Sequence, residues 1–356
     1  MQHVSQIRNR MQRAGMLIFL VLSAVLPLSA QDMKFEYQSL DKGNEEILLF
    51  MRMQDVAYVD KVRLTGEPLR VPRPSNAPFK DTLRDNRLEF YSYVFFPRSV
   101  RQGRKYPLVV FPHGGIHGTF ETGYVHVLRE LVAQGYIVVT PDYRGSTGYG
   151  RSFYEAIDYG GLENEDVLVA RDYMVENYSV VDPDRVGLLG WSHGGMISLM
   201  NILQWPDKYA CAYAGVPVSD VTYRLSYQSP GYGKEFQASY HVGALPEEAP
   251  EEYARRSPVS YASLLEKPLM ITTCLNDDDV SWTEVKRMID ALQAAGKEFE
   301  YKIYPAMRGA HLFERTDEKE ATDIRFKSYR FLAKYLKPAH PFKNEKELRK
   351  AGYKYY

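Results

Sequence analysis

Short apolar runs alternate with amphipathic segments along most of this chain. The apolar, strand-like runs are residues 88–97, 107–112, 136–141, 185–190, 210–217, 268–275 and 298–305. The helical patterns between them are residues 121–133, 163–177, 194–204, 281–295 and 318–336. Runs without polar alternation are typical of strands buried on both faces. Strand–helix alternation therefore predicts the α/β class, with a mostly parallel sheet covered by helices on both faces.

Two stretches depart from this strand–helix alternation and define the expected domain organisation. Residues 219–262 are rich in Tyr, Pro, Gly and Glu, and we expect them to form an insertion over one end of the sheet. Residues 31–84 form an N-terminal accessory segment, helical in character at 43–56, with the proline-containing VPRPSNAP at 71–78 as a linker or turn. The main domain is then 85–338, and 339–356 is a C-terminal tail.

The first thirty residues differ from the rest. Three arginines precede the apolar run MLIFLVLSAVLPL at 16–28, which is too short to span a bilayer comfortably. Together with the small residues Ser29-Ala30 and the polar Gln31 that follows, this pattern predicts a secretory signal peptide cleaved after Ala30. Leu28 is larger than is usual at that position, so an uncleaved anchor is the alternative. We expect a periplasmic or secreted protein with no membrane span in its mature part.

Composition excludes some functions and narrows the fold. Lys+Arg and Asp+Glu are both 45 among 356 residues, so there is no electrostatic signature of nucleic-acid binding. Hydrophobic residues make up 45%, enough for a substantial core. Of the two cysteines, Cys211 is expected at the start of one parallel strand and Cys274 at the end of the next, more than about 10 Å apart at the usual rise per residue. That separation is too large for a disulfide.

The segment GWSHG at residues 190–194 raises the clearest chemical question. It matches G-x-S-x-G and stands between a buried strand and an apolar helix, where a nucleophile turn is expected. Side chains at Gly190 and Gly194 would collide with neighbouring backbone in so tight a turn. Ser192 is therefore a candidate nucleophile at a helix N-terminus. The alternative is a glycine-rich turn with an incidental serine.

A serine nucleophile needs a base and an orienting acid. His311, on a short loop flanked by Gly309 and apolar residues, is the best candidate base; the other histidines lie in the signal, a helix, the insertion, the tail or the glycine-rich segments. The segment CLNDDDV follows a late strand, and any of Asp277, Asp278 and Asp279 could orient that histidine. The chain order Ser, Asp, His is that of the α/β-hydrolase fold.

Backbone donors for an oxyanion are expected in FPHGGIHG at 111–118, which follows an early strand. Gly114 or Gly115 would supply one N–H group and His193, directly after the nucleophile, the other. His113 would support this loop or donate from its side chain. A metal site at His113 and His117 is disfavoured, since a four-residue spacing suits a helix and two glycines lie between them.

Five motifs together resemble the catalytic domain of the prolyl oligopeptidase family, which includes dipeptidyl peptidases and acylaminoacyl peptidases. They are PDYRGSTGYGRSF at 141–153, GWSHGG at 190–195, SPVSYASLLEKPLMI at 257–271, residues 277–280 and GAHLF at 309–313. The resemblance covers residues 85–338. It implies an α/β-hydrolase fold with Ser192 as nucleophile, Asp277 as acid and His311 as base. Asp277 is selected because the family places the acid three residues before a valine, here Val280.

The chain departs from the family pattern in three places. Cys274 replaces a glycine before the acid, and Ile116 replaces the usual proline of the oxyanion loop. The family's β-propeller has no counterpart, since only residues 31–84 separate the signal from the catalytic domain. The propeller restricts family members to short peptides. We therefore expect a more open site, able to accept esters and small acylated compounds as well as peptides.

These observations favour an exported serine hydrolase, foremost a serine peptidase of this family that forms an acyl-enzyme. The alternatives are a carboxylesterase or deacetylase acting on acylated carbohydrates or small esters, and a binding protein that has lost catalysis. His113, Tyr223 and Trp282 are candidates for lining the substrate pocket, although Tyr223 and Trp282 could equally serve in ordinary aromatic packing. No metal or organic cofactor is implied, and no motif specifies an oligomeric state.

Overall fold

A single eight-stranded sheet organises the computed structural model, which describes residues 30–68, 87–238 and 240–354. The strand order is β1-β2-β4-β3-β5-β6-β7-β8. The strands are β1 (Ala57–Pro68), β2 (Arg87–Pro97), β3 (Tyr106–Val110), β4 (Ile137–Asp142), β5 (Val181–Trp191), β6 (Cys211–Gly215), β7 (Leu269–Cys274) and β8 (Glu300–Tyr304). The predicted linker at 71–78 and the predicted signal peptide, apart from Ala30, lie outside the described residues.

The sheet is parallel from β4 to β8 and antiparallel at the β1–β2–β4 edge. Strands β4, β6 and β7 are buried along their whole length, because helices cover both faces. This is why their sequences read as unbroken apolar runs. The predicted α/β fold with a mostly parallel sheet is confirmed.

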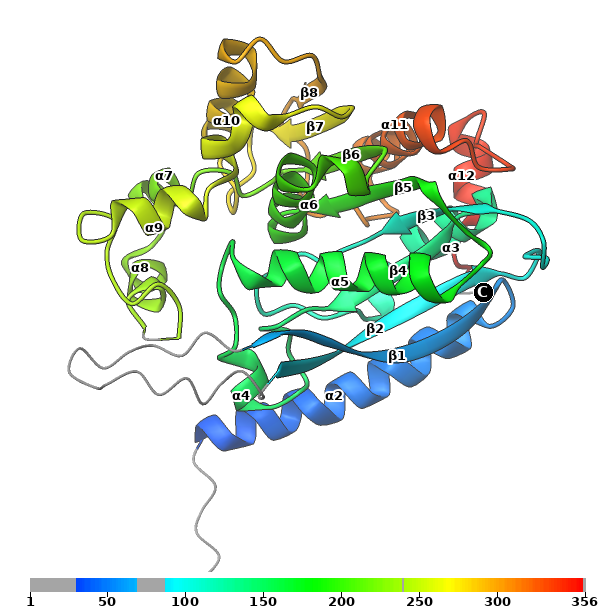
Figure 1. Ribbon diagram of the computed structural model, residues 1–356, viewed down its shortest axis with the longest axis horizontal. Helices are drawn as coiled ribbons and strands as arrows, with labels where there is room; N and C mark the ends of the chain where they lie inside the picture. The colour runs from blue at the N-terminus through cyan, green and yellow to red at the C-terminus, as the bar shows by residue number, and fades with distance from the viewer. Residues whose placement is uncertain (1–29, 69–86, 239, 355–356) are drawn as a thin grey trace, which may run out of the picture.

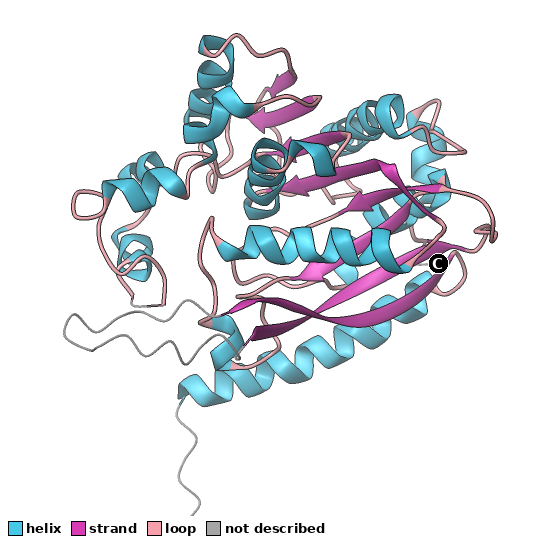
Figure 2. Ribbon diagram, in the orientation of Figure 1, coloured by secondary structure: helices cyan, strands magenta, loops and turns pink. Residues whose placement is uncertain are grey.

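Helices pack on both faces of the sheet (Figures 1 and 2). α5 (Leu162–Asn177) and α6 (His193–Gln204) lie on one face, and α3 (Val125–Gln134) and α11 (Lys319–Leu336) on the other. The remaining helical elements are α2 (Ala30–Met53), η1 (Thr122–Tyr124), α4 (Arg151–Tyr154), η2 (Pro206–Lys208), α7 (Val221–Tyr227), α8 (Pro230–Phe236), α9 (Pro250–Arg255), η3 (Pro258–Leu264), α10 (Trp282–Ala294) and α12 (Glu345–Ala351).

The N-terminal segment is built into this fold. α2 runs beneath the β1–β2 edge in Figure 1, and β1 pairs with β2 from Ala57 opposite Pro97 to Pro68 opposite Arg87. α2 buries Leu49 and Met53 completely and places the ammonium group of Lys42 2.7 Å from the carboxylate of Asp142 at the end of β4. Residues 31–68, which belong to the expected accessory segment 31–84, thus contribute both a strand and a buried ion pair.

Residues 219–262 form a separate cluster of short helices, α7 to α9 and η3, beyond one end of the strands (Figure 1). This cluster contacts the main domain through α7, where Arg224 donates hydrogen bonds to Asp279 in the loop after β7. That loop lies at the carboxyl end of a parallel strand, the edge where α/β proteins place their ligands. The insertion therefore borders the region in which a site is expected.

Both cysteines are buried and free, Cys211 at the start of β6 and Cys274 at the end of β7. The expectation that they do not pair is confirmed. Among the described residues, no helix has the length and apolar character required to cross a membrane.

Candidate active site

Ser192 occupies a sharp turn between β5 and α6. Its φ of 59° lies in the left-handed region, which is uncommon for a residue with a side chain and is typical of functional turns. The Ser192 amide donates to the carbonyl oxygen of Gly215, at 2.9 Å, which anchors the turn to the end of β6. A Cβ at position 190 would overlap the carbonyl oxygen of Gly194, and one at position 194 would overlap that of Pro112. Only glycine fits at these two positions.

Three side chains from three loops meet at this turn. His311 Nε2 lies 2.9 Å from Ser192 Oγ, and His311 Nδ1 lies 2.9 and 3.0 Å from the two carboxylate oxygens of Asp277. A carboxylate accepts hydrogen bonds, so Nδ1 carries the proton and Nε2 is left to accept from the serine hydroxyl. The structure thus brings together the three residues that the sequence singled out as nucleophile, acid and base.

Asp277 is fixed by its own loop. Its Oδ1 accepts hydrogen bonds from the amides of Asp279, at 3.0 Å, and Val280, at 2.9 Å. Its side chain is fully buried, whereas Asp278 and Asp279 are exposed. The short turn to Val280 therefore buries only the first of the three carboxylates and aims it at Nδ1 of His311.

Opposing effects act on the pKa of His311. Burial lowers it, while the hydrogen bond to Asp277 and the negative charges of Asp277 and Asp279 raise it. The carboxylates prevail, and the pKa lies above the ordinary value of 6.5. An imidazole with this environment is a stronger base than a free histidine, as proton abstraction from a hydroxyl requires.

The glycine loop after β3 lies against the nucleophile. A methyl group added at Gly114 would stand 3.5 Å from the Cβ of Ser192, and Gly115 adopts a left-handed φ of 72°. The hydroxyl of Tyr143 donates to the carbonyl oxygens of both His113 and Gly115, at 3.0 Å each. The loop is therefore held rigidly beside Ser192, as a preorganised oxyanion site requires.

His113 supports the oxyanion loop, as one sequence-based expectation had it, but does not line an open pocket, which was the other. Its side chain is fully buried; Nδ1 donates to the Gly114 carbonyl at 3.0 Å, and Nε2 lies 2.8 Å from Ser146 Oγ. Its ring stacks on Tyr143. Burial lowers the pKa of His113 to about 4, so it is neutral near pH 7. Both ring nitrogens are occupied inside the protein, and His113 supports the loop from beneath.

His193, next to the nucleophile, is fixed by a residue that the sequence did not reveal. Its Nε2 lies 3.1 Å from a carboxylate oxygen of Glu163, in the first turn of α5, and both residues are buried. Glu163 also accepts from the amides of Gly160 and Gly161. This contact fixes the side chain of the residue whose amide is predicted to bind the oxyanion. A glutamate 30 residues before His193 gives no sequence signal of this role.

Tyr223 and Trp282 lie on the segments that flank the acid loop. The Tyr223 hydroxyl donates to Thr283 Oγ1 at 3.0 Å, and the Arg287 guanidinium lies 4.8 Å from the Tyr223 ring centre. Trp282 begins α10, and both aromatic side chains are half-buried. Their proposed part in a substrate pocket stays a prediction.

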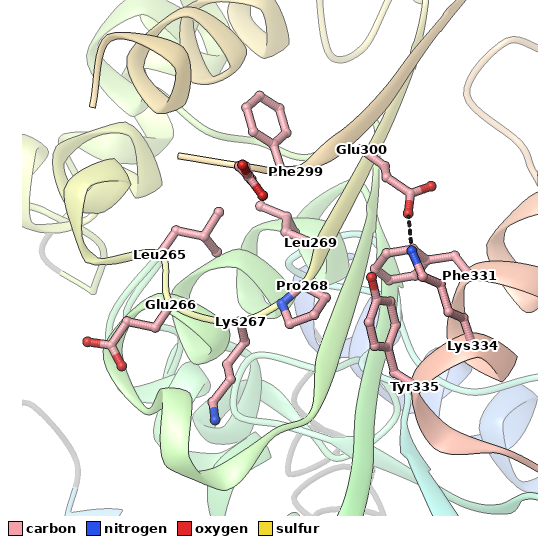
Figure 3. A pocket seen from close by; sticks show the side chains of 11 residues that line it. Leu265, Glu266, Lys267, Pro268, Leu269, Phe299, Glu300, Phe331, Lys334 and Tyr335 are labelled. Atoms are coloured by element: carbon pink, nitrogen blue, oxygen red, sulfur yellow. Dashed lines mark hydrogen bonds and ion pairs between the residues drawn. The ribbon is translucent and has the colours of Figure 1, made fainter. Parts of the chain in front are cut away.

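A separate surface cavity of about 500 Å³ lies at the other end of the strands (Figure 3). Its lining includes Lys267, Leu269, Glu300 and Lys334, with Lys334 donating to Glu300 at 3.3 Å. Leu269 and Glu300 begin β7 and β8, whereas Asp277 follows the end of β7. The cavity is thus at the amino ends of the strands, away from the edge where Ser192, Asp277 and His311 meet.

Comparison with known proteins gives an independent view of the chain. Residues 123–339 match the prolyl oligopeptidase family. The chain is 30% identical over 269 residues to dipeptidyl aminopeptidase BIII of Pseudoxanthomonas mexicana, covering 73% of this chain and 38% of that protein. It is 28% identical over 268 residues to the acylamino-acid-releasing enzyme of Rattus norvegicus, covering 74% and 36%. The chain therefore spans little more than a third of the length of these relatives.

A solved structure has the same fold. The acylaminoacyl peptidase of Pyrococcus horikoshii, without a bound ligand, superposes with a TM-score of 0.64 at 19% sequence identity. The match covers 84% of this chain and 45% of that one. At this identity the similarity establishes the fold and leaves the chemistry to the site itself.

Proposed function

Because the chain belongs to the prolyl oligopeptidase family, as its motifs predict, we propose that it is a serine peptidase working through Ser192, His311 and Asp277. The observation that carries this proposal is the pair of contacts made by one imidazole. His311 Nε2 lies 2.9 Å from Ser192 Oγ while its Nδ1 is bonded to Asp277. These are the contacts that a nucleophile, its base and an orienting acid must make.

In the first half of the reaction, Ser192 Oγ attacks the substrate carbonyl carbon as its proton passes to His311 Nε2. The carboxylate of Asp277 stabilises the imidazolium that forms and holds its tautomer. The amides of His193 and of Gly114 or Gly115 bind the negative oxygen of the tetrahedral intermediate. His311 then returns the proton to the leaving amine, and an ester between Ser192 and the acyl group remains.

In the second half, water replaces the leaving amine. His311 takes a proton from the water, the resulting hydroxide attacks the acyl-enzyme, and a second tetrahedral intermediate occupies the same oxyanion site. Its collapse gives the proton back to Ser192 Oγ and releases the carboxylic acid. Each proton transfer thus passes through one nitrogen, Nε2 of His311.

We also propose that the protein is exported, with cleavage after Ala30. The support is the pattern of residues 1–30: three arginines, a 13-residue apolar run and small residues before a polar segment. The cleavage would fall at the first residue of α2. N-terminal sequencing of the protein recovered from its own cell would test this, and an intact Met1 would contradict it.

The function is tested with two substrate panels, short-acyl aryl esters and aminoacyl or dipeptidyl arylamides, applied to residues 31–356. We expect cleavage of the arylamides, and a loss of about 10³ to 10⁶-fold in Ser192→Ala, as for other triads. Retention of activity by Ser192→Ala would refute the mechanism. Cleavage of esters alone would indicate an esterase. No reaction of Ser192 with a fluorophosphonate would favour the binding protein.

A further inference from the structure

A second carboxylate faces the proton-transfer nitrogen of the site. Asp279 Oδ2 lies 3.4 Å from His311 Nε2, on the side of the imidazole where Ser192 Oγ is also found. The Asp279 side chain is 49% exposed, whereas that of Asp277 is fully buried. Asp277 therefore acts from behind the ring, and Asp279 presents its charge to whatever enters the site from solvent.

The position of Asp279 is fixed by a buried arginine from α7. Arg224 Nη2 donates to Asp279 Oδ1 at 2.7 Å, and Nη1 donates to the Asp279 carbonyl at 3.0 Å. Arg224 is itself held by the hydroxyls of Tyr227, at 3.1 Å, and Tyr232, at 2.9 Å. One carboxylate oxygen of Asp279 is thus clamped, and the other, Oδ2, is left to face the reacting groups.

Arg224 does not cancel the negative charge around the nucleophile. It also faces the carboxyl group of Glu284, at 3.6 Å, while Asp277 is paired with His311. Arg224 thus faces two carboxyl groups, those of Asp279 and Glu284, and Asp277 is a third carboxyl group close to the nucleophile. A preorganised acceptor in such surroundings favours a cationic donor, because charge-assisted hydrogen bonds are the stronger ones.

Covalent geometry limits which substrate atom Oδ2 can reach. For attack, the scissile carbonyl carbon must lie roughly 3–3.5 Å from Ser192 Oγ. An α-amino nitrogen is only about 2.5 Å from the carbonyl carbon of its own residue, by standard bond lengths and angles. A carboxylate oxygen next to Nε2 is therefore within reach of groups on the residue that carries the scissile carbonyl.

We propose that Asp279 binds a positively charged nitrogen on the residue that supplies the scissile carbonyl, and so selects substrates with a free α-amino group over N-acylated and anionic ones. This inference rests on the proposed serine peptidase function, for which it names a substrate class. Asp279 is then a specificity-determining residue, and Arg224 is a positioning residue that acts through it.

The test compares an aminoacyl arylamide of an aliphatic amino acid with its N-acetylated counterpart. For the wild-type protein, kcat/KM should favour the free amine. In Asp279→Asn that preference should fall about 10-fold, the effect of losing roughly 1.4 kcal/mol of differential binding. Asp278→Asn removes the same charge from an exposed neighbour and should leave the ratio within about twofold, as expected for a screened surface charge. An unchanged preference in Asp279→Asn would overturn the inference.

The pH profile gives a readout that loss of folding would not mimic. His311 is faced by Asp277 and Asp279 on the acid loop, by Arg224 on α7 and by Glu314 on its own loop. Removing the charge of Asp279 takes away one group that favours the imidazolium. The acid limb of kcat/KM should therefore move to lower pH in Asp279→Asn and stay in place in Asp278→Asn.

A measurement on the wild-type protein covers the case in which Asp279→Asn does not fold. A primary alkylammonium ion should inhibit aryl-ester hydrolysis more strongly than the alcohol of the same shape, and equal inhibition would contradict the inference. Failure of this inference can be told apart from failure of the proposed function. If only the inference fails, Ser192→Ala is inactive but the preference for the free amine is absent. If the proposed function fails, Ser192→Ala retains activity.

Discussion

At the residue scale, His311 links the charge distribution of the site to its pH dependence. Nε2 must be unprotonated to accept the Ser192 proton, and the pKa of His311 is raised above 6.5 because Asp277 and Asp279 outweigh burial. We therefore expect kcat/KM of the wild-type protein to fall as pH drops through a midpoint above 6.5. The measurement is a pH–rate profile at substrate concentrations far below KM. A rate that stays flat down to about pH 4.5, well below the ordinary histidine pKa, would count against His311 as the base.

Glu163 acts on the neighbouring residue. Burial would raise the pKa of Glu163, but the hydrogen bond and charge of His193 and the amides around it lower the pKa to about 2. We expect Glu163→Gln to reduce the free energy of unfolding by about 1–3 kcal/mol, the range for disturbing a buried hydrogen-bonded group. It should also reduce kcat, because His193 is the residue proposed to supply an oxyanion amide.

Glu165→Gln is the matched control, since Glu165 lies half-buried in the same turn of α5. The lowered pKa of Glu163 also determines how its contribution to the free energy of unfolding changes with pH. Its contribution is present above the ordinary pKa of 4.5 and is lost as pH falls toward 2. Urea unfolding at pH 7 and at pH 3 would measure this. A Glu163→Gln variant equal to wild type at pH 7 in stability and kcat would contradict both expectations.

The role of a single residue could be predicted where a short sequence pattern around it indicates that role. Ser192 is identified by its glycines, and His311 by its short loop after the last strand. Arg224 and Glu163 could not be found in this way, since their partners Asp279 and His193 lie 55 and 30 residues away in the chain. Only the pocket-lining role predicted for His113 was wrong, because the sequence shows a histidine beside glycines but not that Tyr143 and Ser146 enclose its ring.

At the element scale, α2 is joined to the sheet by a buried ion pair. Lys42 lies 2.7 Å from Asp142 and donates to the Phe120 carbonyl at 2.8 Å, and the Asp142 carboxylate also accepts from the amide of Phe120. Replacing Lys42 by Met would leave Asp142 buried without its cation. We expect Lys42→Met to lower the free energy of unfolding by about 3–5 kcal/mol, the range for breaking a buried pair from one side.

Lys61→Met provides the matched comparison, because Lys61 also joins α2 to the sheet, through Glu46 at 2.5 Å. That pair is partly exposed, so its loss should lower the free energy of unfolding by at most about 1 kcal/mol. Denaturant unfolding of both variants would measure the difference. Equal losses in the two variants would show that burial of the Lys42–Asp142 pair has no special effect.

The helices and strands that could be predicted from the sequence were those with a clear local pattern of apolar and polar residues. Strands β3, β4, β6 and β7 read as nearly continuous apolar runs, and all strands from β2 to β8 were placed within a few residues. Strand β1 was missed because it is an edge strand, whose buried Val62 and Leu64 alternate with half-buried Lys61 and with exposed Arg63 and Thr65. The helix expected at 43–56 begins at Ala30 instead. Its first turns lack an obvious apolar stripe, since they bury Phe35 and the charged Lys42.

At the scale of the whole molecule, the N-terminal segment decides which shortened chains can fold. Removal of residues 1–30 takes away only the first residue of α2. Removal of residues 1–56 takes away all of α2, which exposes the surface covered by Leu49 and Met53 and leaves Asp142 without Lys42. The two truncations therefore differ in one helix and one buried ion pair.

We expect residues 31–356 to unfold in a single cooperative transition and to retain activity. We expect residues 57–356 to be insoluble, or to melt at least about 10 °C lower, since several kcal/mol lost from a domain this size shifts the midpoint by a few degrees per kcal/mol. Thermal unfolding followed by circular dichroism, with activity before and after heating, would measure both. If residues 57–356 matched the longer chain in melting temperature and activity, α2 would be a dispensable addition. The structural argument for cleavage after Ala30 would then be lost. That argument is that cleavage there leaves α2, a helix needed for the fold, almost intact.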